Sequence, residues 1–318
     1  MPYSGKTTLF TAMTQSGSVG GRSNQAVVAV PDERIGVLAE LERSSKVVAA
    51  KVRFVDVPGG LTAQGIAQYR QTDALCVVVG AFSPNADPKA ELAALEAELL
   101  LADLASVESG VAKARKRARG TPDAKAELEV LEEAHAHLDA ERPLREVALD
   151  DPALKILRGF GLLTLKPSVI VANVTEGTGL PPALPDRAIA ISASLEAEVA
   201  GMTPEDAGEL LREFGVSEPS LARVIESSYR ALDLITFLTT GEDETRAWAV
   251  RRGARAPEAA GVIHSDLERG FIRAEVVSYG DLVDAGSWAL SKEKGKLRVE
   301  GKDYEVREGD VINVRFAV

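Results

Sequence analysis

The chain has 318 residues, of which 45% are apolar and 27% charged, a composition typical of a folded globular protein. Its net charge of −11 argues against coating long nucleic acid, DNA included, because that binding depends on Lys and Arg neutralising phosphates. The single cysteine, Cys76, excludes an internal disulfide and favours a reducing, cytoplasmic compartment. No apolar run approaches the roughly 20 residues that span a bilayer, and no secretory signal pattern is present, so no membrane partner is expected.

Short apolar, β-branched runs separated by helical segments predict a parallel α/β sheet covered by helices. Each run is apolar on consecutive residues, as expected for strands buried on both faces, so Cys76 within one of them is predicted to be buried. The predicted strands are Val27–Val30, Val52–Val57, Ala74–Val79, Ser168–Ala172 and Ala188–Ser192.

A stretch rich in Ala, Leu and Glu interrupts this pattern over residues 87–151. Its leucines recur at three- and four-residue spacing, with one break at Arg119–Pro122, which predicts two amphipathic helices folded back on each other. The helical hairpin is therefore an insertion into an α/β domain that comprises residues 1–86 and 152–232.

The pattern changes again over residues 233–318, where short apolar runs are bounded by Gly and Asp. This arrangement predicts a separate small α+β domain. Its predicted strands include Lys296–Val299, Tyr304–Val306 and Val311–Phe316.

The segment Ser4-Gly5-Lys6-Thr7-Thr8 matches the second half of the phosphate-binding pattern G-x-x-x-x-G-K-[ST]. In that pattern, backbone N–H groups at a helix N-terminus surround the phosphates, the lysine reaches the β- and γ-phosphates, and the hydroxyl coordinates Mg²⁺. Gly5, Lys6 and Thr7 would take these roles, with Ser4 and Thr8 beside them. A Gly-Lys-Thr tripeptide alone also occurs by chance, so the prediction needs further elements.

The first glycine of the pattern, and the strand that normally precedes it, do not appear before Ser4. A parallel sheet without that strand would lose a central pairing partner and expose unpaired edges, which is costly. We therefore expect the native polypeptide to begin upstream of Met1, and the first strand of the sheet to be missing from this sequence. The intact mass of the endogenous protein would test this expectation.

A second element is the strand that ends in Asp56-Val57-Pro58-Gly59, a D-x-x-G pattern. In P-loop hydrolases the Asp holds Mg²⁺, usually through water, while the Gly N–H meets the γ-phosphate and lets the next loop switch. An ordinary Asp-x-Pro-Gly turn has the same sequence. Asp56 and Gly59 are therefore candidates because of their position in the series of elements.

Two further elements follow apolar strands. Asn173-Val174-Thr175-Glu176 is an N-x-x-E pattern, where GTPases have N-K-x-D and use the Asp to accept from guanine N1 and N2. Val174 and Glu176 in place of Lys and Asp predict a weaker preference for guanine. Ser192-Ala193 is expected to form the short loop that closes over the base. Four elements in this order predict a nucleotide site.

Taken together, these motifs resemble those of the Obg-like ATPases of YchF type, a branch of the translation-factor class of P-loop proteins. The resemblance spans essentially the whole chain, including the hairpin, and is most specific in the last third, which is similar to that family's β-grasp TGS domain. It implies an ATP-preferring hydrolase that associates with ribosomes and acts in translation or stress responses. The segments most similar to the TGS domain are Thr239–Trp248, Ala256–Asp266 and Gly270–Val276.

Both switch loops depart from the family pattern. The first normally carries a Thr that completes the Mg²⁺ shell, whereas this chain offers only Ser23. The second is normally long and rich in Gly and Lys, whereas here Gly60–Gly65 leads quickly into a helix. Ras-type enzymes have a water-orienting Gln directly after D-x-x-G, whereas this chain has Gly60 and then Leu61, and the histidines lie outside both switches. The sequence therefore predicts slow ATP hydrolysis.

Lys113, Arg115, Lys116, Arg117 and Arg119 cluster near the predicted hairpin tip. They form either a patch that contacts ribosomal RNA or a solvated, self-repelling loop. Two alternatives to an ATPase also stay open: a degenerate relative that serves as a ribosome- or RNA-binding adaptor, and a GTP-specific relative.

Overall fold

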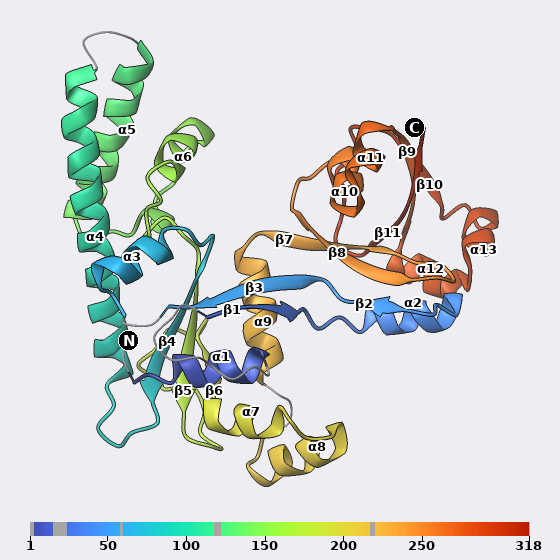
Figure 1. The fold of residues 1–318 in the computed structure, drawn as a ribbon, viewed down its shortest axis with the longest axis horizontal. Coiled ribbons are helices and arrows are strands. Elements are labelled where there is room, and N and C mark those ends of the chain that lie inside the picture. Colours follow the sequence, from blue (N-terminus) through green and yellow to red (C-terminus); the bar gives the residue numbers. More distant parts are fainter. Residues whose placement is uncertain (1–2, 15–23, 58–59, 118–121, 217–219, 318) are drawn as a thin grey trace. The chain divides into compact units, whose positions relative to one another are not determined.

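The computed structural model describes residues 3–14, 24–57, 60–117, 122–216 and 220–317. Contacts between Cα atoms divide the chain into two compact units (Figure 1). The first unit comprises residues 1–26 and 54–224, and the second comprises residues 27–53 and 225–318. Strands β1 (Asn24–Ala29) and β3 (Lys51–Asp56) pair with each other, and each begins in one unit and ends in the other.

A three-stranded parallel sheet forms the centre of the first unit. Its order is β4 (Leu75–Ala81), β5 (Ser168–Val174) and β6 (Ile189–Ile191), with Val79 opposite Ala172 and Ala172 opposite Ala190. In β5 every residue after Ser168 is buried, as the run of apolar residues predicts. The helices of this part are α1 (Lys6–Thr14), α3 (Ala63–Tyr69), α7 (Ala193–Val199), α8 (Pro204–Glu213) and the first residues of α9 (Ser220–Ala231).

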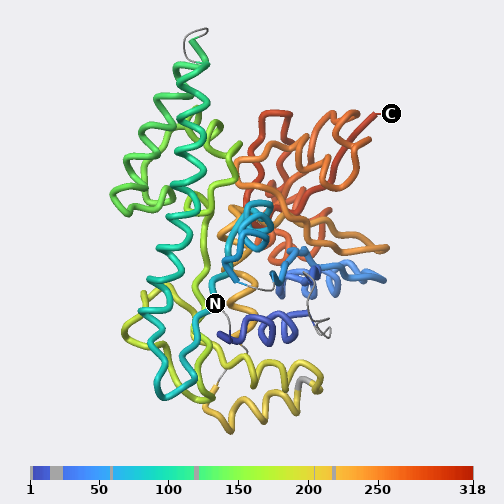
Figure 2. Tube along the Cα trace, turned by 60° about the vertical axis from the view of Figure 1, so that its left-hand side comes forward, coloured from blue at the N-terminus to red at the C-terminus, as the bar shows by residue number. Residues whose placement is uncertain are grey.

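The helical hairpin is inserted between β4 and β5, and it consists of α4 (Pro88–Arg117) and α5 (Pro122–Asp139). Figure 2 shows α4 as one long helix with α5 returning beside it. The two helices pack through fully buried Val107, Ala114, Leu131 and Ala134. The chain then continues through a short 3-10 helix, η1 (Leu144–Glu146), and α6 (Asp151–Arg158) to β5. The predicted hairpin is confirmed, although residues 118–121 of its predicted turn lie outside the described residues.

One buried carboxylate ties the hairpin to the segment before β5. Asp103 of α4 accepts hydrogen bonds from the backbone N–H of Leu163 and from both the backbone N–H and the hydroxyl of Thr164. Arg70, directly after α3, lies 3.6 Å from the same carboxylate and donates to the carbonyl of Ala102. Burial raises the pKa of Asp103, and these hydrogen bonds counteract that rise. Helices α3 and α4 are therefore joined by polar contacts as well as by packing.

The second unit is built on a six-stranded mixed sheet with the order β10-β9-β11-β7-β8-β2. Phe237, Ala260, Ala274 and Val276 are fully buried in its core. The strands are β2 (Val47–Val48), β7 (Leu234–Thr239), β8 (Thr245–Arg251), β9 (Phe271–Ser278), β10 (Arg298–Glu300) and β11 (Asp310–Phe316). The helices are α2 (Arg34–Glu42), α10 (Ala256–Ile263), α11 (Ser265–Arg269), α12 (Tyr279–Ala285), α13 (Trp288–Glu293) and the end of α9.

Residues 27–53 belong to this second unit, whereas the sequence groups them with the rest of residues 1–86. The reason lies in long-range polar contacts. Strand β2 pairs in parallel with β8, and the Ser44 hydroxyl donates to the carbonyl of Gly241 at 2.6 Å. The helical hairpin is predicted as a separate domain, whereas its residues belong to the first unit.

The predicted strands of the α/β domain are found with ends shifted by at most three residues. Two other predictions are wrong. Tyr304–Val306 is no strand, because Glu305 makes only an isolated bridge to Arg255. Cys76 is exposed, not buried, since its side chain points away from the face of β4 that packs in the core. The fold class is confirmed: a parallel α/β sheet with an inserted antiparallel helical hairpin and a smaller C-terminal α+β part.

Candidate functional site

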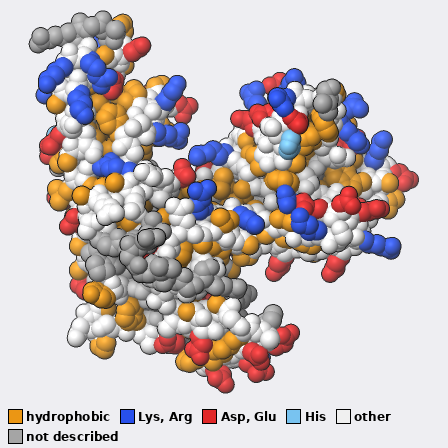
Figure 3. Space-filling model, in the orientation of Figure 1, with side chains coloured by type: hydrophobic (Ala, Val, Ile, Leu, Met, Phe, Trp, Pro, Cys, Tyr) orange, Lys and Arg blue, Asp and Glu red, His pale blue; other side chains and the backbone are white. Residues whose placement is uncertain are grey.

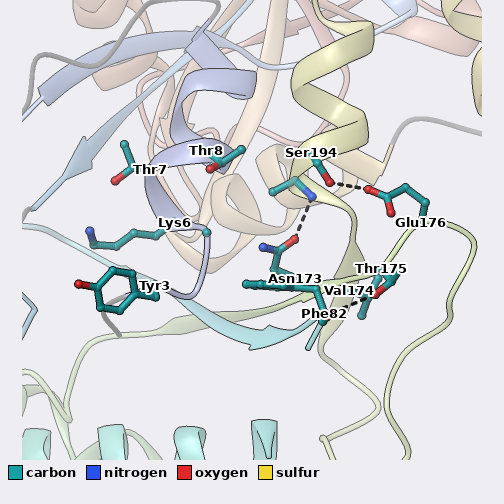
Figure 4. Close-up of a pocket in the computed structure, with 12 residues that line it drawn as sticks. Tyr3, Lys6, Thr7, Thr8, Phe82, Asn173, Val174, Thr175, Glu176 and Ser194 are labelled. Atoms are coloured by element: carbon teal, nitrogen blue, oxygen red, sulfur yellow. Dashed lines mark hydrogen bonds between the residues drawn. The ribbon is translucent and has the colours of Figure 1, made fainter. Parts of the chain in front are cut away.

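A cavity of about 780 Å³ lies in the first unit at the edge where β4 and β5 end and where α1 and α7 begin. In sheets of parallel strands, ligands bind at this edge because loops and helix N-termini converge there. Figure 4 shows Lys6 and Thr7 on one side of the cavity and Glu176 with Ser194 on the other. The lining residues are Tyr3, Gly5, Lys6, Thr7, Thr8, Phe82, Asn173, Val174, Thr175, Glu176, Ala193 and Ser194.

We call Lys6, Thr7 and Asp56 the Lys6 end of the cavity. Lys6 is the first residue of α1, so the unpaired N–H groups of that helix are available beside it. The Thr7 hydroxyl donates to Asp56 Oδ2 at 2.9 Å, and Lys6 Nζ lies 3.4 Å from Asp56 Oδ1. Asp56 is buried at the end of β3, and the ammonium and the hydroxyl together compensate its charge.

The Lys6 end also has the donor set that suits Mg²⁺. This ion prefers octahedral oxygen coordination, keeps several waters, and needs only one or two protein ligands besides phosphate oxygens. The Thr7 hydroxyl and the Asp56 carboxylate are hard oxygen donors within hydrogen-bond distance of each other. No group of three His, Cys, Asp or Glu side chains gathers as a metal site among the described residues. Thr7 and Asp56 are therefore the pair that fits the ion.

Asn173 lies between the two sides of the cavity and joins them. Its side-chain amide donates from Nδ2 to the carbonyl of Ser4 at 3.1 Å and accepts at Oδ1 from the N–H of Ala193 at 2.9 Å. It also approaches Gly5 so closely that a Cβ there would lie 2.1 Å from Asn173 Nδ2. Gly5 has a φ of 87°, a conformation that glycine adopts without strain. The asparagine therefore fixes the start of α1 against the start of α7.

We call Glu176, Ser192 and Ser194 the Glu176 end. Glu176 Oε1 accepts from the Ser194 hydroxyl at 2.5 Å and from the Ser192 hydroxyl at 3.0 Å (Figure 4 shows the first of these contacts). Ser192 caps α7 by accepting from the N–H of Leu195 at 3.3 Å. The Ser194 bond lowers the pKa of Glu176 most, followed by a hydrogen bond from the backbone N–H of Glu176 itself and by the Ser192 bond, because all three stabilise the ionised carboxylate.

The remaining wall residues are less polar. Val174, the last residue of β5, is buried and packs in the core, so only a small part of its side chain faces the cavity. The Thr175 hydroxyl donates to the carbonyl of Phe82 at 3.2 Å, which joins the loops that follow β5 and β4. Phe82 itself is nearly half exposed. The aromatic ring therefore offers an apolar surface at the mouth of the cavity.

The structure brings together nearly all of the residues that the sequence singles out. Ser4, Asp56 and Ser192 do not line the cavity but hold residues that do, while Gly59 and Ser23 lie outside the described residues. Sequence reasoning missed four lining residues: Tyr3, Phe82, Thr175 and Ser194. Phe82 and Thr175 directly follow the ends of parallel strands, which is a signal that could have identified them.

The described lining residues include no histidine. His135 and His137 belong to α5, and His264 precedes α11 in the second unit. Leu61, after the D-x-x-G segment, packs against the core of the α/β sheet. Among the described helices, none is both long and apolar enough to cross a membrane.

Comparison with known proteins gives matches along the whole chain. A family model named YchF-GTPase_C, described as a protein of unknown function (DUF933), matches residues 234–317. "Ribosome-binding ATPase YchF" of Haemophilus ducreyi is 38% identical over 354 residues, covering 100% of this chain and 98% of the relative. The protein of the same name from Bacillus subtilis is 37% identical over 357 residues, with the same coverage.

Two solved structures have the same fold. The Schizosaccharomyces pombe YchF GTPase superposes with a TM-score of 0.87 at 29% identity, covering 99% of this chain and 96% of that one. A GTP binding protein from Pyrococcus horikoshii OT3 superposes with a TM-score of 0.62 at 21% identity, covering 99% and 98%. The second likeness concerns the fold alone.

Proposed function

This chain belongs to the YchF family, since it matches members along its whole length, and we propose that it is a Mg²⁺-dependent nucleoside triphosphatase. It binds ATP in preference to GTP, hydrolyses it slowly, and works on ribosomes in the cytoplasm. The relatives' names, "Ribosome-binding ATPase YchF", support the nucleotide and the partner. The geometry of the cavity supports the residue roles.

One observation carries the proposal: Lys6, Thr7 and Asp56 meet at the start of α1, beside the cavity. A helix N-terminus, a lysine and a hydroxyl together form a site for a polyphosphate, because each supplies a donor or a positive charge. The cavity is also large enough for a nucleotide, since ligand pockets span roughly 300–1,000 Å³.

The residues of the Lys6 end divide the work. The N–H groups that open α1 and the Lys6 ammonium bind the β- and γ-phosphates, while Thr7 and Asp56 hold the metal. When bound there, Mg²⁺ neutralises developing charge on the phosphates and fixes their orientation. Asn173 keeps the start of α1 in register with the loop that contacts the base. Hydrolysis then depends on positioning and charge neutralisation.

Slow turnover follows from what surrounds the phosphates. The described wall has no histidine, Gly60 directly after the D-x-x-G segment has no side chain to orient water, and the next residue, Leu61, packs against the core. We expect a turnover far below the roughly 1–100 s⁻¹ of kinases. Single-turnover hydrolysis by the purified protein measures this, and a rate in the kinase range without any partner would contradict it.

Titration of a fluorescent ATP analogue with Mg²⁺ tests the site itself. Lys6→Ala should weaken binding by at least about 30-fold, since a hydrogen bond to a charged group contributes roughly 2 kcal/mol or more. Lys155→Ala on α6 is the matched control, because Lys155 is exposed and outside the cavity. Equal affinities of wild type and Lys6→Ala would favour an adaptor that does not use this site.

Ribosome binding is proposed to use the basic residues near the end of α4, where Figure 3 shows Lys and Arg side chains gathered. Two of them are already engaged: Arg115 lies 2.8 Å from Glu132, and Arg117 lies 2.9 Å from Glu127. Lys113 and Lys116 are exposed beside them. The lysines are therefore expected to contribute more to a contact with ribosomal RNA phosphates.

Co-sedimentation with ribosomes at two salt concentrations tests this part. The double variant Lys113→Glu and Lys116→Glu should pellet about tenfold less at low salt, and the difference should shrink as salt rises. A variant with Lys155→Glu and Arg158→Glu on α6 makes the same change in net charge away from the hairpin end. If both variants pellet equally, the hairpin end is only a solvated surface.

A further inference from the structure

The Glu176 end has an asymmetry between the two oxygens of one carboxylate. Both serine hydroxyls contact Oε1, at 2.5 Å from Ser194 and 3.0 Å from Ser192. The Ser192 oxygen also accepts from the N–H of Leu195, and its hydroxyl lies 3.1 Å from that of Ser194, so its single proton is shared between Ser194 and Glu176. A carboxylate oxygen has two lone pairs. Both serine hydroxyls therefore engage Oε1, and neither contacts Oε2, which is left to accept from a ligand.

The purine bases differ in what they require from such a carboxylate. Guanine presents N1–H and N2–H₂ side by side, so its full recognition needs two acceptor oxygens. Adenine presents one exocyclic amine, N6–H₂, next to the acceptor N1, so it can donate to a single oxygen. When a ligand binds with one of its polar groups left without a partner, the site discriminates strongly against that ligand.

We propose that Ser192 and Ser194 determine the base selectivity of this cavity: by occupying Oε1 they make Glu176 a single acceptor, which suits adenine and excludes the two-point contact with guanine. This inference rests on the proposed nucleotide function. It assigns to two serines a positioning role that the N-x-x-E pattern alone does not contain.

The surroundings keep this arrangement rigid. Ser192 lies at the end of β6 and caps α7, and the N–H of Ala193, between the two serines, is held by buried Asn173. Glu176 follows three residues after that same asparagine. The backbone that carries the serines and the backbone that carries Glu176 are therefore both anchored at Asn173. Turning Oε1 toward the base would break both serine contacts.

Calorimetric titration of the full chain with Mg²⁺ and ADP, GDP or IDP tests the proposal, since diphosphates are not turned over. Ser194→Ala is the informative variant, because Ser194 is exposed and the α7 cap is left in place. The ratio Kd(GDP)/Kd(ADP) should fall about tenfold, the size expected when GDP gains one hydrogen bond to a charged group. IDP should change little relative to ADP, because hypoxanthine lacks the N2 amine. Ser194→Thr, which keeps the hydroxyl, should restore the wild-type ratio.

Other outcomes distinguish a failure of the inference about the serines from a failure of the proposed nucleotide function. If Ser194→Ala leaves the ratio unchanged, or weakens all three nucleotides alike, the serines have only a structural role and the inference is overturned. A Glu176→Ala background supplies a second check, since Ser194→Ala should then have no further effect on the ratio. If wild type binds none of the three nucleotides, the proposed function itself fails.

Discussion

The Lys6 end and the Glu176 end of the cavity are built in different ways. At the Lys6 end, a lysine, a hydroxyl and a buried aspartate contact one another directly, and each can bind the ligand or its metal. At the Glu176 end, two neutral hydroxyls hold one carboxylate, which is the single charged group of that trio. The comparison suggests that charge at the first end provides affinity for any nucleotide, while hydrogen-bond geometry at the second selects the base.

The largest expected effect comes from Asp56→Asn, which changes the metal ligand and leaves the shape. If the proposed function holds, Mg²⁺ strengthens ATP binding in the wild type. That gain in affinity should be about 100-fold smaller in Asp56→Asn, or roughly 2.7 kcal/mol, because a neutral amide replaces the carboxylate. Without Mg²⁺ the same variant should bind ATP as well as wild type or better, since Asp56 no longer neutralises Lys6. Titration of ATP with and without Mg²⁺ measures both.

Asp186→Asn, at an exposed position outside the cavity, is the control for the change in charge. Equal losses with and without Mg²⁺ in Asp56→Asn would show that the aspartate supports the fold of the Lys6 end and does not hold the metal. The selectivity between ADP and GDP should be unaffected by either variant. A change in that selectivity would break the separation between the two ends.

Gly5→Ala tests the contact between Gly5 and Asn173, the residue that joins the two sides of the cavity. The new Cβ would lie 2.1 Å from Asn173 Nδ2 at a backbone φ of 87°, so the asparagine must move. We expect a loss of about 1–3 kcal/mol in the free energy of unfolding and weaker binding of ADP and GDP alike. Thermal unfolding and calorimetry measure the two effects. Gly179→Ala, whose added Cβ would meet no atom within 4 Å, should change neither.

The Lys6 end could be predicted from sequence because its pattern is local. Gly5, Lys6 and Thr7 are consecutive, and Asp56 closes a recognisable apolar strand. The Glu176 end could be predicted only in part. The pattern indicates Glu176 and Ser192, but the contact from Ser194 depends on how the first turn of α7 faces a loop 18 residues earlier in the chain, which no periodicity encodes.

The same limit explains the errors in the fold. Strand β2 has two residues and pairs with β8 nearly 200 residues later, so nothing near Val47 signals that partner. Cys76 lies in an apolar run that predicts burial on both faces, yet its side chain is exposed although Val78, on the same face of β4, is buried. Long, periodic elements such as α4 and α5 are predicted correctly because their pattern repeats over many turns.

The smallest expected effect concerns acid. Hydrogen bonds from Ser194, from the backbone N–H of Glu176 itself and from Ser192 lower the pKa of Glu176 from its ordinary value of 4.5, so the folded state binds a proton less readily than the unfolded chain. The resulting stability is fully present above the unfolded pKa and is lost as pH falls through the lower folded pKa. Because the side chain is largely open to solvent, the effect amounts to a few tenths of a kcal/mol at most.

An NMR titration of the Glu176 carboxyl carbon isolates this effect. Ser194→Ala should move its pKa up toward 4.5, because the largest cause of the shift is removed, while Ser194→Thr should keep the lower pKa. The preference for ADP over GDP should also weaken in wild type as Glu176 is protonated, since a neutral acid accepts less strongly from the N6 amine. An unchanged titration in Ser194→Ala would mean that the hydroxyl does not hold the carboxylate in solution, and the division between the two ends of the cavity would then rest on Ser192 alone.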